Sequence, residues 1–334
     1  VELSVRCRWE DRIQVAQTIA DMAGKVHVAE IQLSLNHDPI SDAFDANDIH
    51  AALSALSSLP ANSGDVKAIL PKTRIVNVEA CRLYEAGASH ALEVAYALAT
   101  GRRYLDAFIQ AGWSVDDATP LIQFSLAADS DYFVSIAKFR SFRLAWAALI
   151  EGYGAQYDCS VITWINGVTS TRVYDNNELY NNLLRSTIST MSAVIGGADA
   201  VVTSTYNQAN DADALRWARN IQHLLCDESG LDKVYDPGFG VGYVEHATQE
   251  VLNQVYAFLN EWANAGELIS IEGFNWLRNE LDINQKRLVQ GVNNGEATLV
   301  GINKFLLSDE GKVLVADKSS GLAAMKLANK EGVS

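Results

Sequence analysis

Polar side chains that could do chemistry stand at the predicted ends of strands along the chain. In order they are Asn36, His37, Asp38, Glu79, Asp129, Asp131, Asn166, Tyr206, Asn207, Asp236, Asn303 and Lys304. Of these, His37 has an unperturbed pKa near neutrality, which makes it the natural candidate for general acid–base catalysis. A hydrogen bond to Asp38 or to the backbone is the more ordinary role of a histidine in such a loop. The set is therefore polar but poorly suited to acid–base chemistry.

Other candidate groups have ordinary structural explanations. Glu79 lies late in a predicted strand, where we expect a hydrogen-bond acceptor rather than a buried base. The glycine-rich run 238–242 precedes a helix, as phosphate-binding loops do, but no Lys-Ser/Thr follows it, so we predict a tight turn. Arg216 and Arg219 are spaced to clamp an anion, although a solvated helix face paired with Asp213 is the simpler interpretation.

Cysteine and histidine spacing gives no sign of a disulfide framework or a metal site. Cys7, Cys81, Cys159 and Cys226 lie far apart with no CxxC pair, and the six histidines form no HxxxH or HxH pair. We therefore predict reduced, buried cysteines in a cytoplasmic protein.

Composition narrows the class of partner. The chain has 334 residues, 49% of them hydrophobic, and a formal net charge of −15. Such a chain can build a substantial core, and its charge argues against nucleic acid or an anionic membrane as main partner. No secretory h-region or membrane-length apolar run is present. Because the sequence begins with valine, we expect the natural N-terminus to lie outside it.

The candidate residues would be positioned by alternating strands and helices. Strand-like runs fall at 26–36, 66–70, 73–80, 121–128, 159–167, 198–206, 233–237 and 298–305. Helical patterns fall at 10–24, 47–58, 88–101, 102–112, 131–154, 178–195, 212–229 and 245–266, and 59–65 has the composition of a loop.

This alternation predicts the α/β class with a parallel sheet and right-handed crossovers. Eight strands in about 300 residues favour a single-domain (β/α)8 TIM barrel. No GxGxxG run follows a strand, which argues against a dinucleotide-binding fold. We predict an N-terminal helical segment at 1–25, the barrel at 26–305 and a C-terminal tail at 306–334.

Five segments occur together in an order found in one enzyme family. They are residues 84–118, 131–154, 178–201, 215–245 and 297–305. With them the chain resembles the methylmalonyl-CoA mutase family over most of residues 30 to 305. The resemblance implies a (β/α)8 barrel whose axis is threaded by the acyl-CoA tail. It also implies adenosylcobalamin as cofactor, bound by a separate flavodoxin-like domain, and the interconversion of methylmalonyl-CoA and succinyl-CoA.

The chain departs from the family at the positions that do the chemistry. Catalytic members carry a His-x-Gln-Thr-Ser-Gly run, in which Asn166 replaces the histidine while Thr169 and Ser170 remain. Asparagine can donate a hydrogen bond but cannot titrate. Leu121 replaces the arginine that holds the substrate carboxylate, and leucine cannot pair a carboxylate. We therefore predict no catalytic residue, and only weak substrate-binding candidates at Asn166, Thr169, Ser170 and Tyr206.

The cofactor domain also has no counterpart in this sequence. No Asp-x-His-x-x-Gly run occurs, and too few residues follow Phe305 for a flavodoxin-like domain. The chain thus resembles the small, beta-type subunit of a heterodimeric mutase. The resemblance implies a catalytic large (alpha) subunit as partner, which would carry the adenosylcobalamin, and no cofactor or metal bound by this chain.

Two other interpretations stay open at this point. The chain could be the substrate-binding catalytic subunit of a related acyl-CoA mutase whose cobalamin domain is a separate chain. That requires an open bore lined by Ser, Thr and Ala, whereas Leu121, Phe124 and Trp164 are bulky enough to fill one. An unrelated barrel lyase is the weaker alternative, because Lys72 and Lys304 lie only at strand edges and metal ligands are lacking.

Overall fold

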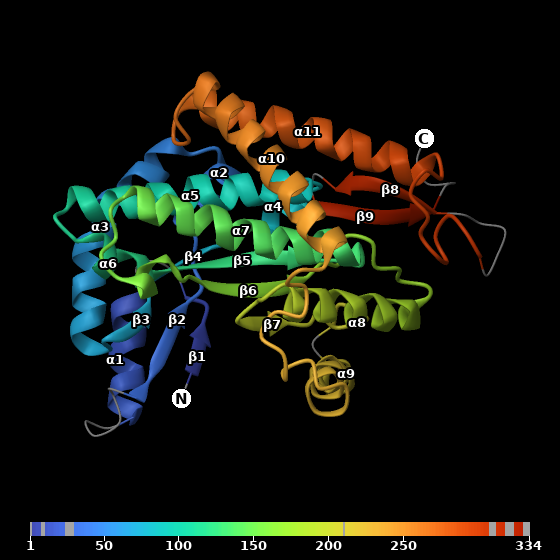
Figure 1. The fold of residues 1–334 in the computed structure, drawn as a ribbon, viewed down its shortest axis with the longest axis horizontal. Coiled ribbons are helices and arrows are strands. Elements are labelled where there is room, and N and C mark those ends of the chain that lie inside the picture. Colours follow the sequence, from blue (N-terminus) through green and yellow to red (C-terminus); the bar gives the residue numbers. More distant parts are fainter. Residues whose placement is uncertain are drawn as a thin grey trace.

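The parallel strands of this protein follow one another in space in the order in which they follow in sequence (Figure 1). The computed structural model describes residues 2–7, 11–23, 30–209, 211–306, 312–317 and 324–329. A three-stranded sheet contains β1 (Glu2–Val5), β2 (Gln32–Leu35) and β3 (Lys72–Arg74). A four-stranded sheet contains β4 (Val76–Val78), β5 (Ile122–Ala128), β6 (Trp164–Thr169) and β7 (Ala200–Val202). The α/β class with parallel sheets is therefore confirmed.

The segment around Ile75 joins the two sheets. Ile75 separates β3 from β4, and its amide donates to the carbonyl of Leu121 at 2.8 Å. The Asn77 amide donates to the carbonyl of His37 at 3.1 Å, directly after β2. This succession of parallel neighbours is the one a barrel needs. Among the described residues β7 does not pair with β1, so the closed eight-stranded barrel stays a prediction.

Helices cover one face of the sheets and extend beyond them (Figure 1). They are α1 (Arg12–Ala23), α2 (Pro39–Ala46), α3 (Ile49–Ile69), α4 (Cys81–Glu85), α5 (His90–Gln110), α6 (Val115–Ala118), α7 (Tyr132–Gly152), α8 (Leu179–Ile195), α9 (Ala212–His223), α10 (Gly242–Ala265) and α11 (Ile271–Asn293). Short 3-10 helices span Thr119–Leu121 (η3) and Asp158–Val161 (η4), and one π-helical turn spans Leu224–Glu228 (η5). No helix among the described residues is long and apolar enough to cross a membrane.

The core lies between β5 and the helices α5 and α7. All seven residues of β5 are buried, as expected for a strand covered on both faces. Phe124 stacks obliquely on Phe142 and Trp146, with ring centroids 4.6 and 4.7 Å away. Phe124 therefore points toward the helices.

Gly101 shows why one predicted helix end is wrong. We expected Gly101 to end a helix, but α5 runs through it without a break. A Cβ on Gly101 would lie 2.7 Å from the Phe124 ring and 2.8 Å from Trp146. The glycine permits close packing of the helix against the sheet. From sequence alone, a glycine needed for packing looks the same as a glycine that ends a helix.

The predicted loop at 59–65 and strand at 66–70 are also wrong, because α3 continues through both. Pro60 lies inside α3, and Leu59, Ser63 and Val66 continue a buried helical stripe. The buried residues recur at helical spacing, and their packing keeps the segment helical although it contains helix-breaking residues.

The C-terminal third differs most from expectation. Residues 233–237 form no strand, and 298–305 contribute only an isolated bridge between Val300 and Lys304. Helix α11 and the antiparallel hairpin of β8 (Lys312–Asp317) and β9 (Ala324–Asn329) were not predicted, nor was strand β1. Residues 26–29 of the predicted strand 26–36 lie outside the described residues. The boundaries 1–25, 26–305 and 306–334 stay predictions.

Candidate functional site

The strands present polar side chains on the face opposite α5 and α7. Because Phe124 points to the helices, its neighbours Gln123 and Ser125 point the other way. Register places Trp164 beside Gln123 and Asn166 beside Ser125. We call this surface the polar face; its members are Ser34, Asn36, Arg74, Asn77, Gln123, Ser125, Trp164 and Asn166.

Side chains of the polar face bond to one another. Ser125 Oγ donates to Asn77 Oδ1 at 2.9 Å, and Gln123 Nε2 donates to Asn36 Oδ1 at 3.1 Å. Asn36 Nδ2 in turn donates to Ser4 Oγ at 2.6 Å. Asn77, Gln123 and Ser125 are buried. The face thus uses most of its polar capacity internally, as buried polar groups must.

Asn166 lies in the middle of β6 and takes part in the same pattern. Its carboxamide oxygen accepts a hydrogen bond from Trp164 Nε1 at 3.0 Å. The guanidinium of Arg74 lies 3.8 Å over the Trp164 ring. Arg74 is the one charged member of the polar face, so this surface holds no side chain that titrates near neutrality.

The other predicted substrate-binding residues lie elsewhere. The hydroxyl of Thr169 accepts from the Ser204 amide at 2.7 Å, which ties the end of β6 to the segment after β7. The Ser170 amide donates to the Ala128 carbonyl at 2.7 Å. Tyr206 stacks on Tyr180 of α8 with centroids 6.0 Å apart. Each of the four candidates contacts a different partner, and their role in binding stays a prediction.

Of the three bulky residues considered as fillers of a bore, Leu121 and Trp164 line one cavity and Phe124 does not. Phe124 packs among the helices, and Leu121 is buried in η3 at the N-terminal end of β5. Trp164 alone of the three lies on the polar face.

A largely buried charged cluster lies at the C-terminal ends of β5 and β6. We call it the rim cluster and define it as Tyr84, His90, Asp129 and Arg172. Arg172 Nη2 lies 3.3 Å from Asp129 Oδ2 and donates to Tyr84 Oη at 2.6 Å. Tyr84 Oη donates to Asp129 in turn, and the guanidinium lies 3.8 Å over the Tyr84 ring. His90 Nε2 is 3.9 Å from Asp129 Oδ1.

Burial and charge set the protonation of the rim cluster. Burial, reinforced by the positive charge of Lys138, lowers the pKa of His90 to about 3. Burial alone would raise the pKa of Asp129, but His90, Arg172 and the Tyr84 hydrogen bond outweigh it and hold that pKa below its usual range. At neutral pH the cluster therefore contains neutral His90 and an Asp129–Arg172 ion pair.

A second buried ion pair lies beneath the rim cluster. Lys138 Nζ of α7 is 2.6 Å from Glu93 Oε2 of α5, and both side chains are fully buried. The Ala127 amide of β5 donates to Glu93 Oε1 at 2.6 Å. Burial raises the pKa of Glu93, while Lys138 lowers it. The pair joins two helices to the central strand.

The loop after β6 is held on both sides. The Thr171 amide and hydroxyl donate to Glu85 Oε2 at 3.2 and 3.1 Å, and Arg172 Nη1 donates to the Ala88 carbonyl at 3.3 Å. On the other side Lys312 of β8 pairs with Asp175. The residues following Thr169 are thus fixed by contacts within the chain.

Sequence reasoning missed Tyr84, His90 and Arg172. Tyr84 and His90 lie at the two ends of the run YEAGASH, which opens the recognised segment 84–118, and Arg172 follows Thr169 and Ser170. Each is 39 to 45 residues away from Asp129 in the chain, so no local pattern indicated the cluster.

The remaining sequence candidates have structural roles. Buried Asp38 accepts hydrogen bonds from Tyr104 Oη at 2.6 Å and from the Glu79 amide at 2.8 Å. Burial is the main cause that lowers the pKa of His37, which lies 3.6 Å from Asp42. Glu79 pairs with Arg6 at 3.2 Å, and burial raises its pKa.

The candidates in the C-terminal half contact other groups than expected. Asp236 pairs with Arg140, and the glycine-rich run 238–242 leads into α10. Arg216 lies 6.0 Å from the Trp217 ring centroid, and no ion pair of Arg216 with Asp213 is seen in the described part of the chain.

Two of the four cysteines are more exposed than predicted. All four cysteines are free, but Cys159 and Cys226 are exposed, so the prediction of buried cysteines is wrong for these two. Within the described ranges no three His, Cys, Asp or Glu side chains form a group that could hold a metal ion.

The fold and the site define an α/β protein with sequential parallel strands that carry a polar face on one side and a cluster of paired charges at their C-terminal ends. A family model described as "Methylmalonyl-CoA mutase" matches residues 18–327. The chain therefore belongs to the methylmalonyl-CoA mutase family.

Individual relatives agree with this family assignment. The chain is 30% identical over 254 residues to "Methylmalonyl-CoA mutase" of Escherichia coli, which covers 74% of this chain and 35% of the relative. It is 31% identical over 259 residues to the mitochondrial enzyme of Homo sapiens, covering 75% and 34%. It is 32% identical over 242 residues to "Methylmalonyl-CoA mutase small subunit" of Porphyromonas gingivalis, covering 71% and 39%. The matched region spans little more than a third of each of these relatives.

Proposed function

We propose that this chain is a non-catalytic small subunit of a heterodimeric methylmalonyl-CoA mutase and supports a catalytic large subunit. The observation that carries the proposal is Asn166. It lies on the polar face with its carboxamide oxygen bonded to Trp164, and no neighbour on that face can exchange a proton near neutral pH. The similarity to a relative named as a small subunit supports the same conclusion.

Leu121 and the rim cluster support the proposal independently. Buried Leu121 cannot bind a carboxylate, and Arg172, the cation near the end of β6, is already paired with Asp129. Within the rim cluster, the charge of Arg172 is therefore already compensated. The strand-end loops that carry catalytic residues in barrel enzymes are here tied to one another.

Adenosylcobalamin, which the family resemblance implies, does not fit the residues described here. A histidine that ligates cobalt needs an accessible ring nitrogen. His90 and His37, the histidines nearest the strand ends, are only 14% and 18% exposed and lie beside Asp129 and Asp42. The exposed His50, His223 and His246 lie on helices α3, α9 and α10. We therefore assign the cofactor to the proposed partner and derive no reaction step through it.

Co-expression with a methylmalonyl-CoA mutase large subunit tests the proposal. We expect the two chains to co-elute in size-exclusion chromatography, with activity and bound cobalamin following the large subunit. Asn166→His in this chain should leave co-elution and activity unchanged and should give no turnover by this chain alone. Failure of the chains to co-elute, or turnover by the isolated variant, would refute the proposal.

The composition of the polar face favours one second candidate. Ser34 and Ser125 are small, as an acyl-CoA channel requires, so a substrate-binding subunit with its cobalamin domain on another chain is the alternative. Calorimetric titration with acetyl-CoA distinguishes the two. Saturable micromolar binding to the isolated chain favours the alternative, and absence of binding favours the non-catalytic subunit.

A further inference from the structure

The antiparallel hairpin of β8 and β9 packs on a small hydrophobic cluster of its own. The two strands pair with each other along their whole length and lie beside the C-terminal half of α11 (Figure 1). Val292 of α11, Leu314 of β8 and Met325 of β9 are the buried members of this cluster, which is separate from the main core. We call β8 and β9 together the strap.

The strap is not part of the parallel sheets. Among the described residues no strand of those sheets pairs with β8 or β9. On the side of β8 that faces α11, one side chain takes the place of a neighbouring strand. The Leu314 amide donates to Asn293 Oδ1 at 2.9 Å, and Asn293 Nδ2 donates to the Leu314 carbonyl at 3.3 Å. Moving the strap away from the body therefore breaks no pairing between strands.

A buried ion pair connects the strap to the loop after β6. Lys312 of β8 pairs with Asp175, and their side chains are only 10% and 2% exposed. The structure around Asp175 does not need the strap. Asn182 of α8 bonds the amide and the carbonyl of Asp175, at 3.0 and 2.8 Å, and the Asn177 amide donates to Asp175 Oδ1 at 2.8 Å. The loop therefore keeps a receptor for Lys312 when the lysine leaves.

The other strand of the strap covers the turn that follows α4. Met325 of β9 is buried, and a Cβ on Gly87 would lie 3.3 Å from its sulfur. Gly87 lies between Tyr84 and His90 in the chain, and the loop that Lys312 contacts carries Arg172. The strap thus lies across two of the segments that supply the rim cluster.

Packing beneath the strap is incomplete. A groove of about 510 Å³ lies between α11 and β8, with Gln285, Val289 and Val315 among its lining residues. The small cluster has three buried members, whereas all seven residues of β5 are buried in the main body. Segments with few buried apolar contacts open at a lower free energy than the core does.

We propose that the strap opens and closes as one unit over the C-terminal rim while the main core stays folded, and that the Lys312–Asp175 pair is the latch that closes it. Opening exposes the loop 170–178 and the turn at Gly87, and so gives solvent access to the segments that carry Arg172 and Tyr84. The inference rests on contacts within this chain and does not depend on the proposed subunit function.

Hydrogen exchange of the full chain at pH 7, followed by mass spectrometry, tests whether the strap opens by itself. We expect the amides of β8 and β9 to exchange together and at least about tenfold faster than those of β5, because the opening of the strap does not require unfolding of the core. Exchange of the strap at the rate of β5 would overturn the proposal, since the strap would then open only when the whole protein unfolds.

Variants of the latch test its role. Lys312→Met leaves Asp175 without its cation and should speed exchange of both β8 and β9 at least about tenfold, with β5 unchanged. Asp175→Asn should have the same effect from the other side, and the double variant should open no further than either single one. The matched control, Lys286→Met, removes an exposed ion pair within α11 and should leave the strap unchanged.

Three results with these variants would refute the latch. Lys312→Met and Asp175→Asn could leave the strap as slow as the control does, which would mean that the pair does not hold it closed. One strand could respond without the other, so that β8 and β9 would not move as a unit. Exchange of β5 could accelerate as much as that of the strap, which would make the pair a support of the whole fold.

Discussion

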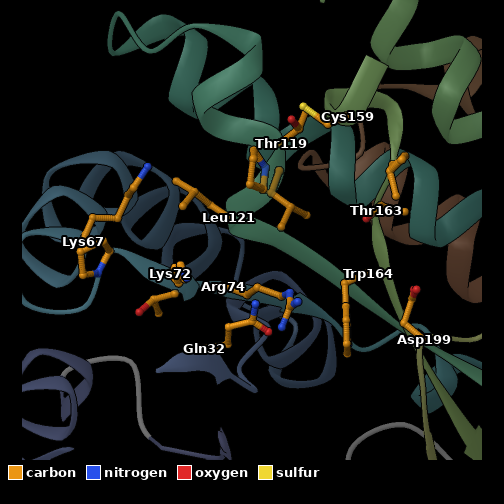
Figure 2. A pocket seen from close by; sticks show the side chains of 15 residues that line it. Gln32, Lys67, Lys72, Arg74, Thr119, Leu121, Cys159, Thr163, Trp164 and Asp199 are labelled. Atoms are coloured by element: carbon orange, nitrogen blue, oxygen red, sulfur yellow. The ribbon is translucent and has the colours of Figure 1, made fainter. Parts of the chain in front are cut away.

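The two ends of the parallel strands differ in how their cationic side chains are paired. At the C-terminal rim, Arg172, Asp129 and Tyr84 satisfy one another, and Lys138 does the same for Glu93. At the N-terminal end, Lys67 and Lys72 lack carboxylate partners among the described residues, and the Thr163 hydroxyl lacks any partner there. The cations Arg172 and Lys138 are paired within the chain, whereas Lys67, Lys72 and Thr163 line a cavity of about 440 Å³ at the opposite ends of the strands (Figure 2). Substitutions of single residues test this difference.

Lys138→Met should cause the largest loss at the rim. The variant leaves the fully buried Glu93 without its cation, and breaking such a pair from one side costs about 3–5 kcal/mol of unfolding free energy. Urea denaturation at pH 7 measures this. The double variant Lys138→Met with Glu93→Gln should recover part of the loss, since it removes the uncompensated charge. A loss below about 1 kcal/mol in the single variant would contradict the assignment.

Arg172→Met should have the next largest effect, about 2–3 kcal/mol, because Asp129 keeps Tyr84 as a donor but loses its cation. The pKa of Asp129 should then rise. Lys286→Met, which breaks an exposed pair on α11, serves as control and should change stability by less than about 0.5 kcal/mol. Equal effects of the two variants would mean that the rim cluster does not stabilise the fold.

His90 should make the rim sensitive to acid. Its pKa is about 3 in the folded protein, and that of an unfolded histidine is about 6.5. Between these values the unfolded chain binds a proton that the folded chain does not, so stability falls as pH decreases, by up to about 1.4 kcal/mol per pH unit. His90→Gln should flatten the dependence between pH 6.5 and 4 in urea denaturation. An unchanged slope would show that His90 titrates normally in the folded protein.

Thr163→Val should have the smallest effect and the opposite sign. Because valine keeps the shape and removes the unpartnered hydroxyl, stability without ligand should stay unchanged or rise by up to about 1 kcal/mol. Ser125→Val, which removes a hydroxyl bonded to Asn77, is the comparison and should lose about 1–2 kcal/mol. If Thr163→Val destabilises as much as Ser125→Val, the two ends of the strands do not differ as described.

Local sequence was sufficient to predict much of the fold. The α/β class and the helices α7 and α8 followed from hydrophobic spacing, because helix periodicity is a property of neighbouring residues. The chemistry of position 166 was likewise determined by residue identity, since no fold lets an asparagine titrate. The family membership followed from collinear segments that the matched range of residues 18–327 supports.

Tertiary structure decided what each polar or small residue does. Gly101 became a packing site because Phe124 and Trp146 come from other elements. Arg172 became part of a filled rim because Tyr84 and Asp129, distant in sequence, meet it at the ends of β5 and β6. Lys67, Lys72 and Thr163 share one cavity for the same reason. Pairing and burial depend on long-range contacts, and those exist only once the strands are in register.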